Sequence, residues 1–170
     1  YEIVYVPTHR SHLDYLLMSY VVHQSGFPVP HTAAGKNLDF FPVGGLLRKG
    51  GAFYLRRSFR GKKLYSAVFN EYLHFLLSHG YPMTFFPEGG RSRTGKLLQL
   101  KTGMFSMIVH SYLRDPKKPV AFVPVYIGYD KVFELGSYLK ELSGAVKQKE
   151  SLLQFLQSWK ILKQYFGKAY

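Results

Sequence analysis

The chain has 170 residues, 46% of them apolar, which suits one globular domain with a sizeable core and excludes a disordered segment. Its net charge of +13 calls for an anionic partner, such as nucleic acid, a phosphorylated substrate or an anionic membrane surface. The absence of cysteine excludes disulfides, thiolate metal sites and a cysteine nucleophile.

No run of residues approaches the roughly 20 apolar positions of a membrane-spanning helix. The chain starts with Tyr1 inside an expected strand, so we expect it to be part of a longer protein.

The first expected unit is a strand at 3–7, a turn, and a helix from about 12 to 23. Ser11 and Asp14 are spaced like a capping box, which places His9 in the turn and Asp14 in the first helical turn. From there Asp14 can face back and hold one imidazole nitrogen of His9, leaving the other to accept a proton. The segment predicts either a His–Asp dyad or a plain helix N-cap beside a surface histidine.

The rest of the chain alternates between expected strands and helices. Alternation predicts an α/β domain with a mixed, largely parallel sheet flanked by helices, as a single domain over 1–170. Pro124 lies inside an apolar run typical of a buried strand, but it cannot donate a ladder hydrogen bond and should mark an edge or a bulge. The remaining expected strands are 32–36, 52–57, 83–86, 120–127 and 164–170. The remaining expected helices are 42–48, a helix that Arg60, Lys62 and Lys63 open and Gly80 ends, 103–113, and segments within 131–163.

The most polar and glycine-rich loop, 87–96, follows the expected strand at 83–86. Its Glu88 could bind substrate hydroxyls while Arg91 or Arg93 takes a phosphate, or it could pair with an arginine and rigidify the loop. At the end of the strand at 52–57, Arg56 and Arg57 point to opposite faces, so one of them should enter a cleft. These candidates and His9 all follow carboxyl ends of strands, where open α/β sheets bind ligands.

Other motifs fit less well. The segment 90–96 is similar to a phosphate loop, but Leu97 stands where that motif needs a hydroxyl residue. The segment 90–94 is similar to a nucleophile elbow, but Thr94 stands where that motif needs glycine. His9, His12 and Asp14 could begin a metal cluster, so a metal-dependent hydrolase is an alternative. The aromatic residues do not alternate with basic ones and no nucleic-acid-binding signature occurs, so no nucleic acid is expected as a partner.

Four blocks in order resemble the glycerolipid acyltransferase superfamily: HRSHLD at 9–14, GAFYLRR at 51–57, FPEGGRS at 86–92 and VPVYI at 123–127. The sequences GGRSRTG, KTG and YIGY at 89–95, 101–103 and 126–129 resemble in particular its bacterial membrane-bound branch, which acylates glycerol 3-phosphate. Members of this branch are much longer, so the chain is expected to be a catalytic core with that superfamily's fold.

The resemblance implies acyl transfer from acyl-CoA or acyl carrier protein to the sn-1 hydroxyl of glycerol 3-phosphate, the first step of phospholipid synthesis. It implies that His9 is the general base and Asp14 its orienting partner, and that Pro124 has a structural or acyl-donor role. Lysophosphatidate or dihydroxyacetone phosphate are alternative acceptors. The acceptor site would comprise Arg57, Glu88, Gly89, Arg91 and Ser92, with Arg93 added from the loop's charge.

The residues agree with this chemistry. Without a usable cysteine or serine nucleophile, the acceptor hydroxyl should attack the thioester directly, with His9 contributing about 10²–10⁴-fold as a general base. No metal or cofactor is expected beyond the acyl donor as co-substrate. The positive charge suits the anionic substrates and an anionic membrane surface, and we expect membrane association at the cytoplasmic face of the bacterial inner membrane.

Overall fold

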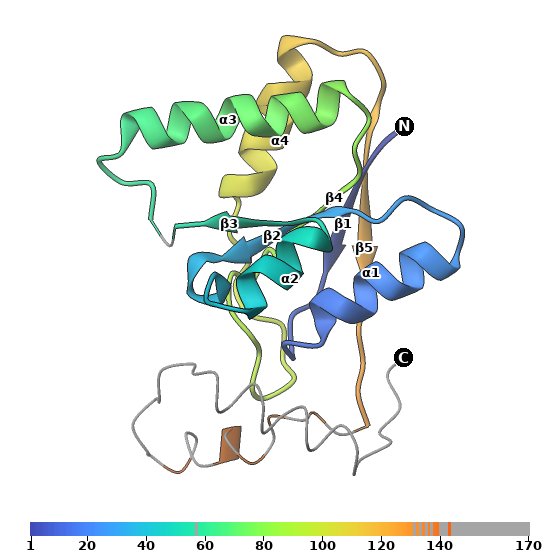
Figure 1. Cartoon of the computed structure of the whole chain (residues 1–170), viewed down its shortest axis with the longest axis vertical. Coiled ribbons are helices and arrows are strands. Elements are labelled where there is room, and N and C mark those ends of the chain that lie inside the picture. The colour runs from blue at the N-terminus through green and yellow to red at the C-terminus, as the bar shows by residue number, and fades with distance from the viewer. Residues whose placement is uncertain are drawn as a thin grey trace.

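The computed structural model describes residues 1–56 and 58–130, together with 132, 134, 136, 138, 139 and 143. Its centre is one sheet of five strands in the order β3-β2-β4-β1-β5 (Figure 1). All the pairs between these strands are parallel, so the predicted α/β fold with a largely parallel sheet is confirmed. The strands are β1 (Glu2–Pro7), β2 (His31–Gly35), β3 (Ala52–Leu55), β4 (Met83–Thr84) and β5 (Val120–Val125).

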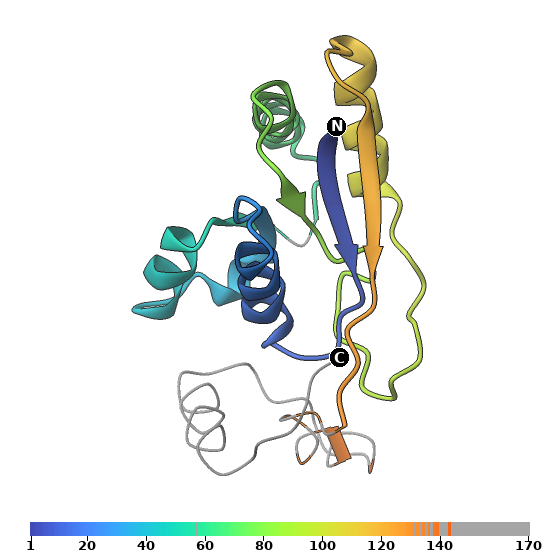
Figure 2. The same cartoon turned by 90° about the vertical axis from the view of Figure 1, so that its right-hand side faces the viewer.

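Helices cover both faces of the sheet. In Figure 2, β1 and β5 run side by side, with α1 on one side of them and α4 on the other. Among the described residues, no helix combines the length and apolar character needed to cross a bilayer. The helices are α1 (Asp14–Gln24), the short 3-10 helix η1 (Lys36–Leu38), α2 (Val43–Lys49), α3 (Lys63–Ser78) and α4 (Gly103–Arg114).

Alternation along β1 divides the core into two layers. Val4 faces α3 and α4, where it packs with Leu73 and Ile108, and none of these three side chains is exposed to solvent. The next residue, Tyr5, faces α1 and packs with Met18 and Val22. Burying such a side chain contributes about 1.5–3 kcal/mol, so these two layers fix β1 and thereby the turn that follows it.

Several expected boundaries differ from those observed. β3 ends at Leu55 and β4 at Thr84, each two residues before the expected end. The run at 120–127 was expected to be buried, but β5 is an edge strand whose residues are all at least partly exposed. Pro124 pairs with Val6 on this edge, which confirms the expectation that proline marks an edge. Arg57, the expected strand at 164–170 and most of 131–163 lie outside the described residues.

Candidate active site

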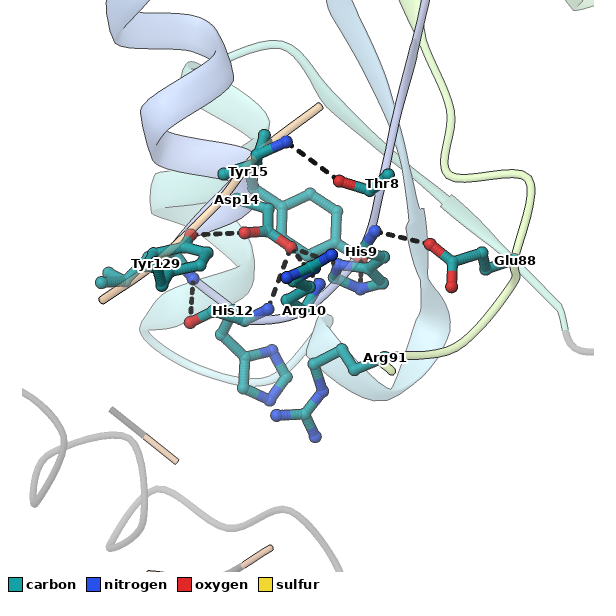
Figure 3. A network of polar contacts seen from close by, with 12 residues as sticks. Thr8, His9, Arg10, His12, Asp14, Tyr15, Glu88, Arg91 and Tyr129 are labelled. Carbon is teal, nitrogen blue, oxygen red and sulfur yellow. Dashed lines mark hydrogen bonds and ion pairs between the residues drawn. The ribbon is translucent and has the colours of Figure 1, made fainter. Parts of the chain in front are cut away.

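The turn after β1 brings His9 and Asp14 together. Their side chains meet through His9 Nδ1 and Asp14 Oδ2, 2.8 Å apart (Figure 3). Asp14 is fully buried and His9 is 6% exposed, so the contact is shielded from water. Thr8 ties the turn to the end of β5, because its N–H donates to the Val125 carbonyl and its hydroxyl accepts from the Ile127 N–H. The geometry is that of the expected dyad.

Hydrogen bonds surround the Asp14 carboxylate. Oδ2 also accepts the backbone N–H groups of Arg10 at 2.6 Å and Ser11 at 2.9 Å, and Oδ1 accepts the hydroxyl of Tyr129. Burial alone would raise the pKa of Asp14, but the hydrogen bonds from His9, Tyr129, Ser11 and Arg10 outweigh it and the pKa lies below its ordinary value. Asp14 is therefore ionised at neutral pH and can only accept, which assigns the proton of neutral His9 to Nδ1.

The other ring nitrogen of His9, Nε2, is then an acceptor. It lies 3.4 Å from the hydroxyl of Tyr15, a long contact for an O–H donor. The ring packs against Phe86, with ring centres 4.2 Å apart, and meets Tyr15 edge-on at 5.3 Å. These aromatic contacts fix the ring plane, and Nε2 has the chemical state that a general base needs.

Ser11 acts differently from the expected N-cap. The helix begins at Asp14, not near residue 12, with Leu13 as the N-cap. The Ser11 hydroxyl accepts the Leu13 N–H at 3.1 Å and donates to Glu134, whereas the backbone N–H of Ser11 donates to Asp14. Ser11 therefore orients Asp14 through its main chain.

Glu88 braces the turn from the neighbouring loop. Its Oε1 accepts the backbone N–H of His9 at 2.8 Å, and its Oε2 accepts the N–H of Leu98 at 2.9 Å. Glu88 is only 4% exposed. The carboxylate thus rigidifies the site through backbone amides, while its predicted contact with substrate hydroxyls stays a prediction.

Replacing Glu88 with glutamine should remove one of these two hydrogen bonds, because an amide has only one acceptor oxygen. We expect a loss of about 1–3 kcal/mol in the free energy of unfolding, together with lower kcat. Urea denaturation and steady-state kinetics measure both. Glu71→Gln is the matched control, because Glu71 pairs with Arg114 at the exposed surface and should leave both quantities unchanged. Equal unfolding curves for wild type and Glu88→Gln would contradict the bracing role.

Ser92 and Gly89 shape the loop. The Ser92 N–H donates to the His9 carbonyl at 2.7 Å, and its buried hydroxyl donates to the Lys96 carbonyl. Gly89 has a φ of +61°, in the left-handed region that disfavours a side chain. The structure therefore gives both residues a conformational role beside His9, and their predicted substrate contacts stay predictions.

Arg91 and Arg93 converge on Tyr138, whose hydroxyl donates to the Arg10 carbonyl in the turn that carries His9. Their guanidinium carbons lie 5.7 and 5.9 Å from the ring centre of Tyr138. Arg91 also donates to the Tyr138 hydroxyl at 3.2 Å and to Glu134 at 3.3 Å. Guanidinium groups are suited to binding a phosphate, but Glu134 already pairs with Arg91, so the predicted phosphate contact of Arg91 and Arg93 stays a prediction.

Sequence reasoning missed Tyr129, Glu134 and Tyr138, which all follow β5. Glu134 accepts from the Ser11 hydroxyl, the His12 N–H at 2.9 Å and Arg91. The sequence at 126–129 signals only a family pattern, and no spacing rule relates a tyrosine to a glutamate in an irregular segment. Their partners lie more than 40 residues away in sequence, which no local pattern reports.

Pro124 and the arginines after β3 are the remaining predicted residues. Pro124 is exposed on β5 and is not part of the dyad's contacts. Arg57 lies outside the described residues, whereas Arg56 lines a hollow of about 400 Å³ beyond β2 and β3. Among the described residues, no group of three His, Asp or Glu side chains is placed to hold a metal ion. The hollow is lined by Lys36, Asp39, Arg48, Ala52, Phe53, Tyr54, Arg56 and Tyr65.

Two family models match the chain. The model described as "Acyltransferase" matches residues 1–128, and the model described as "Glycerol-3-phosphate acyltransferase C-terminal region" matches residues 138–170. The Acyltransferase match includes the dyad and the loop with Arg91.

Similar proteins carry related names. The chain is 55% identical over all 170 residues to a glycerol-3-phosphate acyltransferase of Pseudomonas putida, and 56% identical over 165 residues, 97% of the chain, to one of Pseudoalteromonas atlantica. It spans about a fifth of the length of these curated relatives, 20% in each. A crystal structure of the 1-acyl-sn-glycerophosphate acyltransferase PlsC from Thermotoga maritima is 20% identical, with a TM-score of 0.47, covering 86% of this chain and 68% of that one.

Proposed function

Because the chain belongs to the acyltransferase family, we propose that it is the catalytic core of a glycerol-3-phosphate acyltransferase. The enzyme would transfer an acyl group from acyl-CoA or acyl carrier protein to the sn-1 hydroxyl of glycerol 3-phosphate, the first step of phospholipid synthesis. The observation that carries this proposal is the buried His9–Asp14 pair, whose second ring nitrogen is an acceptor. Relatives named glycerol-3-phosphate acyltransferase support the choice of acceptor.

The reaction follows from the state of the dyad. His9 Nε2 takes the proton of the acceptor hydroxyl while that oxygen bonds to the thioester carbonyl carbon. Asp14 stabilises the imidazolium that results, as it does not itself take the proton. The carbon–sulfur bond then breaks, and the leaving thiolate receives the proton from His9. The products are the acyl ester and a free thiol, and the enzyme returns to its starting state.

Positively charged side chains would hold the acceptor in place. Arg91 and Arg93, with the predicted Arg57, would hold the phosphate so that the hydroxyl lies at Nε2. Fixing both reactants in this way makes the step effectively unimolecular, which can contribute several kcal/mol to lowering the barrier. The acceptor phosphate would bind the Arg91 guanidinium. The Glu134 carboxylate, which lies 3.3 Å from that guanidinium, would have to move aside.

The proposed location is the cytoplasmic face of the bacterial inner membrane. Leu97 and Leu100 are 62% and 46% exposed in the loop between Lys96 and Lys101, and Phe41 is 90% exposed near α2. Apolar side chains flanked by lysines suit an anionic lipid surface. The net charge of +13 also suits the anionic acyl donor.

A panel of acceptors with one labelled acyl donor tests the proposal on the full-length protein. We expect acylation of glycerol 3-phosphate well above that of lysophosphatidate or dihydroxyacetone phosphate. If the enzyme preferred either alternative acceptor, the proposed substrate would be wrong, whereas the proposed mechanism would still hold. Activity that EDTA abolishes and added metal restores would instead favour the metal-dependent hydrolase.

Replacing Arg57 with alanine should raise the KM for glycerol 3-phosphate by about 10–100-fold with little change in kcat. Loss of a charge-assisted hydrogen bond to phosphate sets this magnitude. Steady-state kinetics with varied acceptor gives both constants. Arg60, an exposed arginine three positions further along the chain, provides the control, and Arg60→Ala should keep the wild-type KM. An unchanged KM in Arg57→Ala would remove Arg57 from the acceptor site.

A further inference from the structure

Tyr129 reaches the dyad from a distant part of the chain. It follows β5 and lies 115 positions from Asp14, yet its hydroxyl donates to Asp14 Oδ1. Figure 3 shows Tyr129 and His9 at different oxygens of the same carboxylate. The hydroxyl is therefore part of the buried network around the proposed base.

The hydrogen-bond donors around Asp14 are divided unequally between its two carboxylate oxygens. The donors from His9, Arg10 and Ser11 all contact Oδ2. In the described part of the chain, the donor at Oδ1 is Tyr129. A carboxylate held at one oxygen only can turn about its Cβ–Cγ bond, and a donor at the second oxygen prevents that rotation.

Tyr129 also stays a donor under working conditions. Burial, followed by the hydrogen bond to Asp14 and the negative charge of Asp14, raises the pKa of Tyr129 well above its ordinary value. The phenol therefore remains protonated, and its O–H points to an anion that is itself ionised. The contact is a charge-assisted hydrogen bond, the stronger class.

We propose that Tyr129 is a positioning residue for acyl transfer, which locks the Asp14 carboxylate so that Oδ2 faces His9 Nδ1. This role rests on the proposed function, because it acts through the base of that reaction. The Tyr129 hydroxyl contacts the Asp14 carboxylate, so it would act on the reacting nitrogen only through Asp14. Its effect should therefore appear in kcat and depend on the presence of Asp14.

Tyr129→Phe in the full-length protein tests this role, since it removes the hydroxyl and keeps the ring. We expect kcat to fall about tenfold, the scale of one hydrogen bond to a charged group, while both KM values stay within about twofold. Tyr126→Phe is the matched control from the same segment. Tyr126 is 65% exposed and contacts Arg10 through its ring, which phenylalanine keeps, so wild-type kcat is expected.

A double-mutant cycle separates positioning from general stability. In the Asp14→Ala background no carboxylate remains to be held, so adding Tyr129→Phe should change the residual kcat by less than about twofold. An equal tenfold loss in both backgrounds, or wild-type kcat in Tyr129→Phe, would overturn the positioning role. If the wild-type protein turns over and His9→Ala does not, such a result leaves the proposed function standing. Absence of acyl transfer by the wild-type protein would overturn that function itself.

Discussion

Replacing His9 with alanine is expected to lower kcat for acyl transfer by about 10²–10⁴-fold, the usual contribution of a general base. The acceptor hydroxyl would then have to lose its proton to water. The fold should persist, because the ring packs mainly on Phe86 and Tyr15 at the edge of the core. Turnover of a labelled acyl donor at saturating glycerol 3-phosphate measures the loss.

His12→Ala provides the control for this experiment. His12 lies in the same turn, and its backbone N–H, which alanine keeps, donates to Glu134. We expect its kcat to stay within about twofold of wild type. A His9→Ala protein that kept most of its turnover would disprove the assignment of the base, whatever the acceptor.

Asp14→Asn is expected to lower kcat by up to about 10⁴-fold, as the same change does in the related Ser-His-Asp arrangement, where it leaves the imidazole in the wrong tautomer. A neutral amide cannot stabilise the imidazolium that forms in the reaction. It also brings an N–H₂ group among four donors, from His9, Arg10, Ser11 and Tyr129, so one buried contact becomes repulsive. Kinetics at saturating substrates measures this loss.

Asp39→Asn serves as the comparison for Asp14→Asn. Asp39 pairs with Arg48 at the surface, so its amide should leave kcat near wild type. A small effect of Asp14→Asn, equal to that of Asp39→Asn, would mean that the carboxylate serves only to cap the turn.

The dyad was predictable because its two members are local. His9 and Asp14 are five residues apart at a strand-to-helix turn, and the spacing alone allowed the contact that the structure has. Alternating apolar segments likewise predicted the parallel sheet. Both features depend on short-range geometry, which residue order records.

The surroundings of the dyad were not predictable from the sequence. Glu88 looked like a partner for substrate or arginine, yet it accepts from the backbone N–H groups of His9 and Leu98, which leave no mark in residue identity. Similarly, hydrophobicity alone does not tell an edge strand from a central one, so the run at 120–127 reads as buried and only Pro124 indicates the edge position of β5. The contacts of Tyr129 and Glu134 with the turn after β1 depend on the pairing of β1 with β5.

That pairing has a consequence for how the protein acquires its site. Asp14 lies near the N-terminus of the chain. The hydroxyl of Tyr129 reaches it only after a loop of more than 100 residues has closed. Contacts of such long sequence separation slow folding. A nascent or proteolysed chain that ends before β5 would carry the complete His9–Asp14 motif, yet its carboxylate would lack the cover that makes it a dry, fixed partner.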